Sequence, residues 1–187
     1  GKAIVLLWLH GGVHDYKKHD FFSFNHLDCV DADERILEYL KDSGTKAIAL
    51  FPVCHKSNNP KTVAWRDCYD DVEHIINDYI NKGLVDKKRI YVTGSSDGGV
   101  GTWDYAEKHP EMFAAAISMS CSSPRKVDIP IYFFNTRSEK DCTDKVKELK
   151  KKGVKVKYKY CPQYKHGGDA AECTPELLKE FFSIKKK

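Results

Sequence analysis

A serine flanked by glycines is the first feature of this sequence that could carry out covalent chemistry. Ser96 lies in the stretch Gly94-Ser95-Ser96-Asp97-Gly98-Gly99, which fits the pattern G-x-S-x-G. Small residues at these positions let the backbone turn sharply between a strand and a helix. The turn exposes the serine hydroxyl beside the first N–H groups of the helix. This arrangement suits a serine nucleophile that attacks a carbonyl carbon, and the alternative is a turn that only binds phosphate.

Two other segments could supply the base and the hydrogen-bond donors that a nucleophilic serine requires. His10-Gly11-Gly12 follows an apolar run, and its small residues would let backbone N–H groups turn toward the serine. His166 lies on a loop late in the chain, between the last expected strand and the last expected helix. A general base on such a loop can reach back to the nucleophile, so we expect His166 to be the base of Ser96.

The carboxylate that would orient this histidine is left open by the sequence. The loop Thr136–Asp144 offers Glu139, Asp141 and Asp144. Distance from the preceding strand favours Glu139, whereas residue type favours Asp141, and Asp144 ranks third. Both Glu139 and Asp141 are therefore kept as candidates.

Aromatic residues near these segments could form a substrate pocket. We expect Trp65, Trp103 and His10 to contribute to it, and the long loop after the first strand could add Tyr16, Phe21, Phe22 and Phe24. The alternative is that most of these aromatic residues lie in the core, as aromatic side chains usually do.

The elements that must position these residues alternate along the chain. The continuous apolar run Ala3–Leu9 predicts a strand buried on both faces. Further strands are expected at 47–51, 89–93, 114–119, 129–135 and 154–160, and helices at 31–40, 70–81, 100–108, 144–152 and 175–182. This alternation predicts an α/β fold, a three-layer α/β/α sandwich with a mainly parallel sheet, and residues 1–187 suit a single domain. Such sheets carry their sites at the carboxyl ends of the strands.

Composition narrows the possible partners. Hydrophobic residues make up 41% of the 187 residues and charged residues 31%, and no apolar run is long enough to span a membrane. The net charge of +4 comes with lysines clustered late in the chain, which we assign to solvated surfaces rather than to nucleic-acid binding. The seven cysteines form no C-x-x-C pair. They suggest one or two disulfides and slightly favour a secreted or periplasmic protein over a cytoplasmic one.

Three stretches of the chain resemble a known enzyme superfamily. His10-Gly11-Gly12, the segment 91–103 around the serine motif, and His109–Ala116 are similar to the esterase D, feruloyl esterase and polyhydroxybutyrate depolymerase-like branch of the α/β hydrolases. They also resemble the predicted peptidases of that superfamily, which are phospholipase- or carboxylesterase-like. Pro52-Val53-Cys54, with Trp65 further on, resembles a loop of the same proteins.

The resemblance implies a serine carboxylic-ester hydrolase with a Ser-acid-His triad in this chain order. Ser96 and His166 carry over directly, and the amides of Gly12 and Asp97 carry over as oxyanion donors, with Gly11 near. The implied substrates are small-molecule or polysaccharide-linked esters, such as feruloyl or acetyl esters, and no metal or organic cofactor is needed.

Two departures from the family pattern bear on this expectation. Asn135–Glu139 stands where the family has His-Gly-x-x-Asp, which leaves the acid undecided, and the family's extra early strands are missing. We therefore expect a minimal α/β-hydrolase fold with no large cap and an open site. A peptidase or thioesterase with the same triad, or a non-catalytic carbohydrate-binding relative, is the alternative.

Overall fold

In the computed structural model the described residues are 1–12, 30–54 and 65–186, and they contain one six-stranded parallel sheet. The strand order across the sheet is β2-β1-β3-β4-β5-β6. The strands are β1 (Ala3–Leu9), β2 (Ala47–Leu50), β3 (Val85–Ser95), β4 (Ala115–Met119), β5 (Ile131–Thr136) and β6 (Val156–Cys161). Because all six strands run in the same direction, their carboxyl ends share one edge of the sheet.

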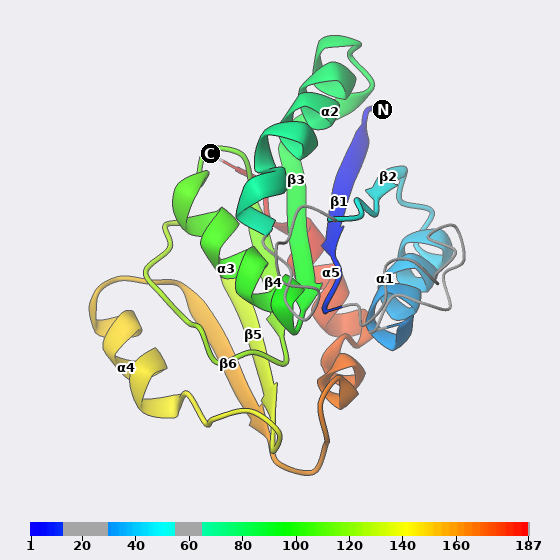
Figure 1. Ribbon diagram of the computed structural model, residues 1–187. Helices are drawn as coiled ribbons and strands as arrows, with labels where there is room; N and C mark the ends of the chain where they lie inside the picture. The colour runs from blue at the N-terminus through cyan, green and yellow to red at the C-terminus, as the bar shows by residue number, and fades with distance from the viewer. Residues whose placement is uncertain (13–29, 55–64, 187) are drawn as a thin grey trace.

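Helices cover both faces of this sheet, as Figure 1 shows. The helices are α1 (Val30–Asp42), α2 (Tyr69–Asn81), α3 (Asp97–Lys108), α4 (Thr143–Lys151) and α5 (Pro175–Ser183). Short 3₁₀ helices, η2 (Trp65–Cys68) and η3 (Gly168–Glu172), precede α2 and α5. Apolar side chains of α1 and α5 pack on one face of the sheet, and those of α2, α3 and α4 pack on the other. The predicted α/β fold class with a mainly parallel sheet is therefore confirmed.

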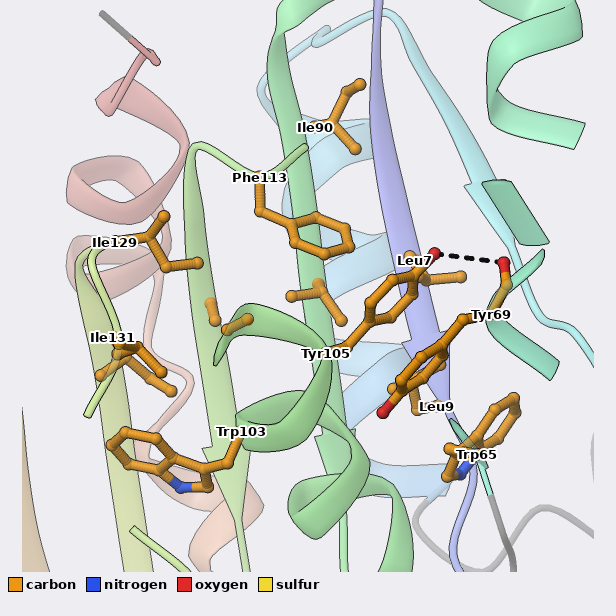
Figure 2. Packing of buried hydrophobic residues seen from close by; sticks show 14 of the residues in the cluster. Leu7, Leu9, Trp65, Tyr69, Ile90, Trp103, Tyr105, Phe113, Ile129 and Ile131 are labelled. Carbon is orange, nitrogen blue, oxygen red and sulfur yellow. Dashed lines mark hydrogen bonds between the residues drawn. The ribbon is translucent and has the colours of Figure 1, made fainter. Parts of the chain in front are cut away.

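The strand β1 shows why the sheet needs helices on both faces. Its seven side chains are all buried and point alternately to the two layers. On one side, Leu7 and Leu9 join a cluster in which the ring of Tyr69 stacks on that of Tyr105 at 3.9 Å (Figure 2). The Tyr105 hydroxyl also donates a hydrogen bond to the Tyr69 carbonyl. A strand with no polar face is stable only when water is excluded from both sides, as it is here.

The helix after the serine motif begins earlier than the sequence pattern indicates. α3 starts at Asp97, immediately after Ser96, whereas the apolar pattern suggested Val100. Glycines disfavour a helix, but packing requires them here. A Cβ atom built on Gly98 would lie 1.8 Å from the Leu9 carbonyl oxygen of β1, and one built on Gly94 would lie 2.4 Å from the Gly98 oxygen. The turn therefore rests directly on the end of β1.

Among residues 1–12, 30–54 and 65–186, no helix combines the length and the apolar character that are needed to cross a bilayer.

Replacing Gly98 by alanine tests this close approach. Helix propensity alone predicts that Gly98→Ala stabilises α3 by about 1 kcal/mol. The contact with the Leu9 oxygen instead predicts a loss of roughly 1–3 kcal/mol in the free energy of unfolding, the usual cost of overpacking, or more. Urea unfolding followed by circular dichroism measures the difference.

Gly153→Ala is the control for this variant. Gly153, unlike Gly98, has a positive φ, of 86°, and an added Cβ there would meet nothing within 4 Å, so only a backbone cost of about 1–2 kcal/mol is expected. A Gly98→Ala protein at least as stable as the unchanged chain would show that the close approach is not required.

Candidate active site

Ser96 occupies a strained turn between β3 and α3. Its backbone has φ 59° and ψ −124°, a region that residues with side chains rarely adopt. The Ser96 N–H donates to the Met119 carbonyl at 3.0 Å, and the Ser96 carbonyl accepts from the Val100 N–H at 3.0 Å. The turn is thus fixed from both sides, by β4 and by the first turn of α3. The serine is half-buried at the carboxyl edge of the sheet.

The loops after β5 and β6 bring Glu139 and His166 together. The imidazole Nδ1 lies 2.5 Å from Glu139 Oε1, and this carboxylate is largely buried while the imidazole is half exposed. The other oxygen, Oε2, accepts from the N–H and the hydroxyl of Thr136 at 2.9 and 2.7 Å. Because Nδ1 faces the carboxylate, Nε2 is left on the opposite side of the ring. A base oriented by an acid has this arrangement.

Asp141 and Asp144 do not take part in this contact. Asp141 Oδ1 accepts from the N–H and the hydroxyl of Thr143 at 2.9 and 2.7 Å, and from the Tyr158 hydroxyl at 3.0 Å. The Thr143 hydroxyl, with the Thr143 amide, holds the pKa of the Asp141 carboxyl below its usual range. Asp144 is exposed and forms an ion pair with Lys147 at 3.2 Å. Of the three carboxylates that the sequence offered, only Glu139 meets the histidine.

Neighbouring residues at the end of β4 connect to Ser96 and to the loop of His166. Met119 accepts the hydrogen bond of the Ser96 N–H. The next residue, Ser120, accepts from the N–H of Gly167 through its hydroxyl oxygen, at 2.8 Å. Ser96 and His166 therefore lie at the same edge of the sheet, each anchored within one residue of the same point on β4.

The loop after β1 is shaped by His10, whose ring is buried. Nε2 accepts a hydrogen bond from the Cys54 N–H at 3.0 Å, so the ring proton is assigned to Nδ1. Nδ1 then donates to the Gly11 carbonyl at 2.7 Å. In a trans peptide the C=O and the following N–H point in opposite directions, so the Gly12 N–H points away from this ring. His10 acts on the backbone of the predicted oxyanion loop rather than as a substrate ligand.

The two tryptophans predicted to bind substrate are both largely buried, but Trp65 also lines a cavity. Trp103 is fully buried, with its ring 5.4 Å from that of Phe133, so its expected place in a pocket is wrong (Figure 2). Trp65 is 2% exposed, and its indole N–H donates to the His10 carbonyl at 3.0 Å. Large aromatic side chains stabilise a fold mainly through the large apolar area that they bury. The other aromatic residues proposed for the pocket, Tyr16, Phe21, Phe22 and Phe24, lie outside the described residues.

A cavity of about 340 Å³ with several charged side chains in its lining lies beside the Ser96 turn, and no sequence motif indicated it. Asp97 and Val100 of α3 line it together with an edge of Trp65, and its floor contains the buried carboxylate of Asp104. Arg66 and Arg125 each donate to Asp104 Oδ1 at 2.9 Å. Burial alone would raise the pKa of Asp104, but hydrogen bonds from Arg66 and Tyr69 and the nearby Lys108 hold it below its usual value.

The cysteines correct one expectation. All six cysteines in the described part of the chain are buried and none of them is in a disulfide there, so the predicted one or two disulfides are not found in this part. Cys29, the seventh, lies outside it. Burial raises the pKa of the Cys121 thiol to about 12, which keeps this thiol protonated near neutral pH. Residues 1–12, 30–54 and 65–186 contain no group of three or more His, Cys, Asp or Glu side chains that could hold a metal ion.

Removing the His10 ring tests its structural role. In a His10→Ala variant the Cys54 N–H and the Gly11 carbonyl lose their partner in a buried place, which costs roughly 1–3 kcal/mol per group. We expect urea unfolding to show a loss of at least that size. His74→Ala, on the exposed side of α2, is the control and should change stability by less than about 0.5 kcal/mol. Equal stability of the two variants would contradict the role of His10.

Comparisons with known proteins bear on the fold of this chain. Residues 59–123, less than half of the chain, match the model of the prolyl oligopeptidase family, and no curated protein sequence matches. A thermostable esterase is similar in structure over 99% of this chain, with a TM-score of 0.71 and 23% identity. The chain spans only 56% of that esterase.

Two further solved structures match over most of their own length. SOBER1 of Arabidopsis thaliana has a TM-score of 0.65 and 19% identity, over 97% of this chain and 96% of its own. S-formylglutathione hydrolase of Staphylococcus aureus has a TM-score of 0.62 and 18% identity, over 97% of this chain and 80% of its own. The resemblance predicted from the sequence is confirmed at the level of the fold: this chain has the fold of the α/β-hydrolase serine hydrolases.

Proposed function

We propose that this protein is a serine hydrolase that cleaves carboxylic esters through Ser96, His166 and Glu139. The observation that carries the proposal is the Glu139–His166 pair at the sheet edge that also carries the strained Ser96 turn. A buried carboxylate bonded to Nδ1 of an exposed histidine orients Nε2 toward a proton donor and stabilises the imidazolium. The thermostable esterase among the structural neighbours supports the same reaction class.

The proposed reaction is acyl transfer through a covalent intermediate. Ser96 Oγ attacks the ester carbonyl carbon while His166 Nε2 takes the hydroxyl proton. The oxyanion accepts hydrogen bonds from the amides of Asp97, at the positive end of α3, and of Gly12. His166 then protonates the leaving alcohol. Water attacks the acyl-enzyme in the same manner, and Ser96 is regenerated. No step requires a metal or an organic cofactor.

Feruloyl and acetyl esters, free or linked to plant polysaccharide, are the proposed substrates. The proposal rests on the family resemblance of the serine motif, and it includes no nucleic-acid or membrane partner. The cavity beside Asp97 supports a polar leaving group, because its lining combines two arginines with aspartates of opposite charge. A neutral, hydroxyl-rich group such as a sugar can hydrogen-bond to both kinds of side chain.

A peptidase with the same triad is the second candidate, and the match of residues 59–123 to the prolyl oligopeptidase family favours it. The S-formylglutathione hydrolase among the neighbours similarly favours a thioesterase. A non-catalytic relative that binds carbohydrate would keep the cleft but lack an activated serine. These functions share one fold and differ in turnover, so a common set of substrates separates them.

The central test compares the unchanged protein with Ser96→Ala. We expect the unchanged protein to hydrolyse p-nitrophenyl acetate and methyl ferulate faster than an acyl-thioester or a chromogenic peptide, and to be labelled by a fluorophosphonate probe at Ser96. Ser96→Ala should lose labelling and essentially all turnover, because no covalent intermediate can form.

Two results would contradict the proposal in different ways. Faster cleavage of the peptide or the thioester would select one of the alternative reactions. Absence of labelling and of all turnover in the folded, unchanged protein would indicate a non-catalytic relative.

The choice of acid has its own test. Glu139→Gln keeps the size of the side chain but removes the charge that orients and stabilises the imidazolium, so we expect kcat for the ester to fall by about 10²-fold or more. Asp141→Asn is the matched control, because Asp141 contacts Thr143 and Tyr158 instead, and kcat should change by less than about threefold. The reverse order of effects would place the acid at Asp141.

A further inference from the structure

A second carboxylate lies buried behind the proposed base. Asp169, in η3, is three residues from His166 and has no exposed surface. Its two oxygens both accept from one residue: Oδ2 from the Ser120 N–H and Oδ1 from the Ser120 hydroxyl, each at 2.7 Å. Burying a carboxylate is costly unless hydrogen bonds compensate it, and here a single serine provides two of them.

The Ser120 hydroxyl links Asp169 to the loop that carries His166. A hydroxyl group has one proton to donate, and that of Ser120 points to Asp169. Its oxygen is thereby left to accept from the Gly167 N–H, at 2.8 Å. Gly167 directly follows His166, so the order of donors and acceptors runs from the buried carboxylate to the peptide bond beside the imidazole.

The backbone of Ser120 indicates that this contact is maintained at a cost. Its φ is 48°, and Ser96 is the only other non-glycine residue with a positive φ in the described part of the chain. Such conformations persist only where the surroundings enforce them. Here the enforcing contacts are the hydroxyl bond to Asp169 Oδ1 and the Ser120 N–H, which is shared between Asp169 Oδ2 and the Phe134 carbonyl.

We propose that Asp169 is a positioning residue, which acts through Ser120 to hold the loop of the base in register with the nucleophile. The inference rests on the proposed function. His166 is then held at three places: its N–H by Ser138, its ring by Glu139 and its following amide by Ser120. Glu139 sets the rotation of the ring, whereas Asp169 and Ser120 set the place of the backbone from which the ring extends.

The electrostatic surroundings make this contact sensitive to pH. Burial raises the pKa of Asp169 to about 6, although its hydrogen bonds from Ser120 oppose the shift, and the negative charge of Glu139 adds to it. The charge of Asp169 acts electrostatically on three buried thiols, of Cys121, Cys161 and Cys173, and burial raises the pKa of each to about 12, so they stay neutral. On α1, Arg35 acts on Cys173. Among the described residues, no cation forms an ion pair with Asp169. The carboxylate therefore gains a proton as the pH falls through about 6 and then loses acceptor strength toward Ser120.

Ser120→Gly tests the step through the hydroxyl. Glycine adopts a positive φ without strain, so the variant removes the hydroxyl while keeping the turn. We expect kcat for p-nitrophenyl acetate to fall about tenfold or more with KM within twofold, because a displaced base slows the chemical step. Labelling of Ser96 by the fluorophosphonate probe should slow by the same factor. Ser123→Ala, in the same loop, is the control and should match the unchanged protein.

Asp169→Asn tests the charge and does not depend on the folding of the first variant. Protonation of Asp169 should lower activity, so log(kcat/KM) of the unchanged protein should fall more steeply below about pH 6 than that of Asp169→Asn. In Asp169→Asn this additional fall should be absent, and kcat at pH 8 should be about tenfold lower than in the unchanged protein.

Two outcomes overturn the proposal. Either variant with wild-type kcat and labelling rate, or Asp169→Asn with a lower melting temperature but an unchanged kcat and pH profile, would reduce Asp169 to a structural residue. Failure of the proposed function is distinguishable, because the unchanged protein would then show no labelling at Ser96.

Discussion

The backbone of the turn that carries Ser96 passes so close to the end of β1 that no side chain fits between them. A Cβ on Gly98 would reach 1.8 Å from the Leu9 oxygen, and the same oxygen would lie 2.8 Å from a Cβ on Gly94. This contact fixes where α3 begins and therefore the direction of its dipole. It also leaves Ser96 in a backbone conformation that costs of order 1–3 kcal/mol and that only a rigid surrounding can maintain. The buried strands on either side provide that rigidity.

The proposed base, His166, is held by a different physical principle, the pairing of buried carboxylates with fixed donors. Glu139 is oriented by the N–H and hydroxyl of Thr136, and Asp169 by the N–H and hydroxyl of Ser120. In both pairs one residue at the end of a strand supplies two donors to one carboxylate. Because β4 and β5 are adjacent and parallel, the two pairs lie side by side at the edge where Ser96 is also placed. The parallel pairing of β4 and β5 therefore determines where the loops of Glu139 and Asp169 lie relative to Ser96.

Much of this fold could be predicted because its signals are local. A wholly apolar run such as Ala3–Leu9 permits few structures other than a strand buried on both faces. The stripe of α2 is equally direct, and its helix was predicted to within one residue at Asp70–Asn81. The start of α3 could not be predicted in this way, because glycine propensity argues against a helix and only the contact with β1, distant in sequence, reverses that preference.

The candidate site could likewise be predicted where its signals are local and not where they depend on residues distant in sequence. The sequence pattern identified Ser96, His166 and a loop of three carboxylates, since each stands next to a strand end. It could not choose between Glu139 and Asp141, because that choice depends on where β6 delivers His166. It also assigned Trp103 to a pocket, whereas this side chain is fully buried. It gave no indication of Asp169, which is fully buried as well. An aspartate near a histidine is a common pattern on a surface, and only a partner 49 residues away distinguishes this one. Residues that position a catalytic group through the backbone therefore leave little trace in local sequence, whereas residues that react do.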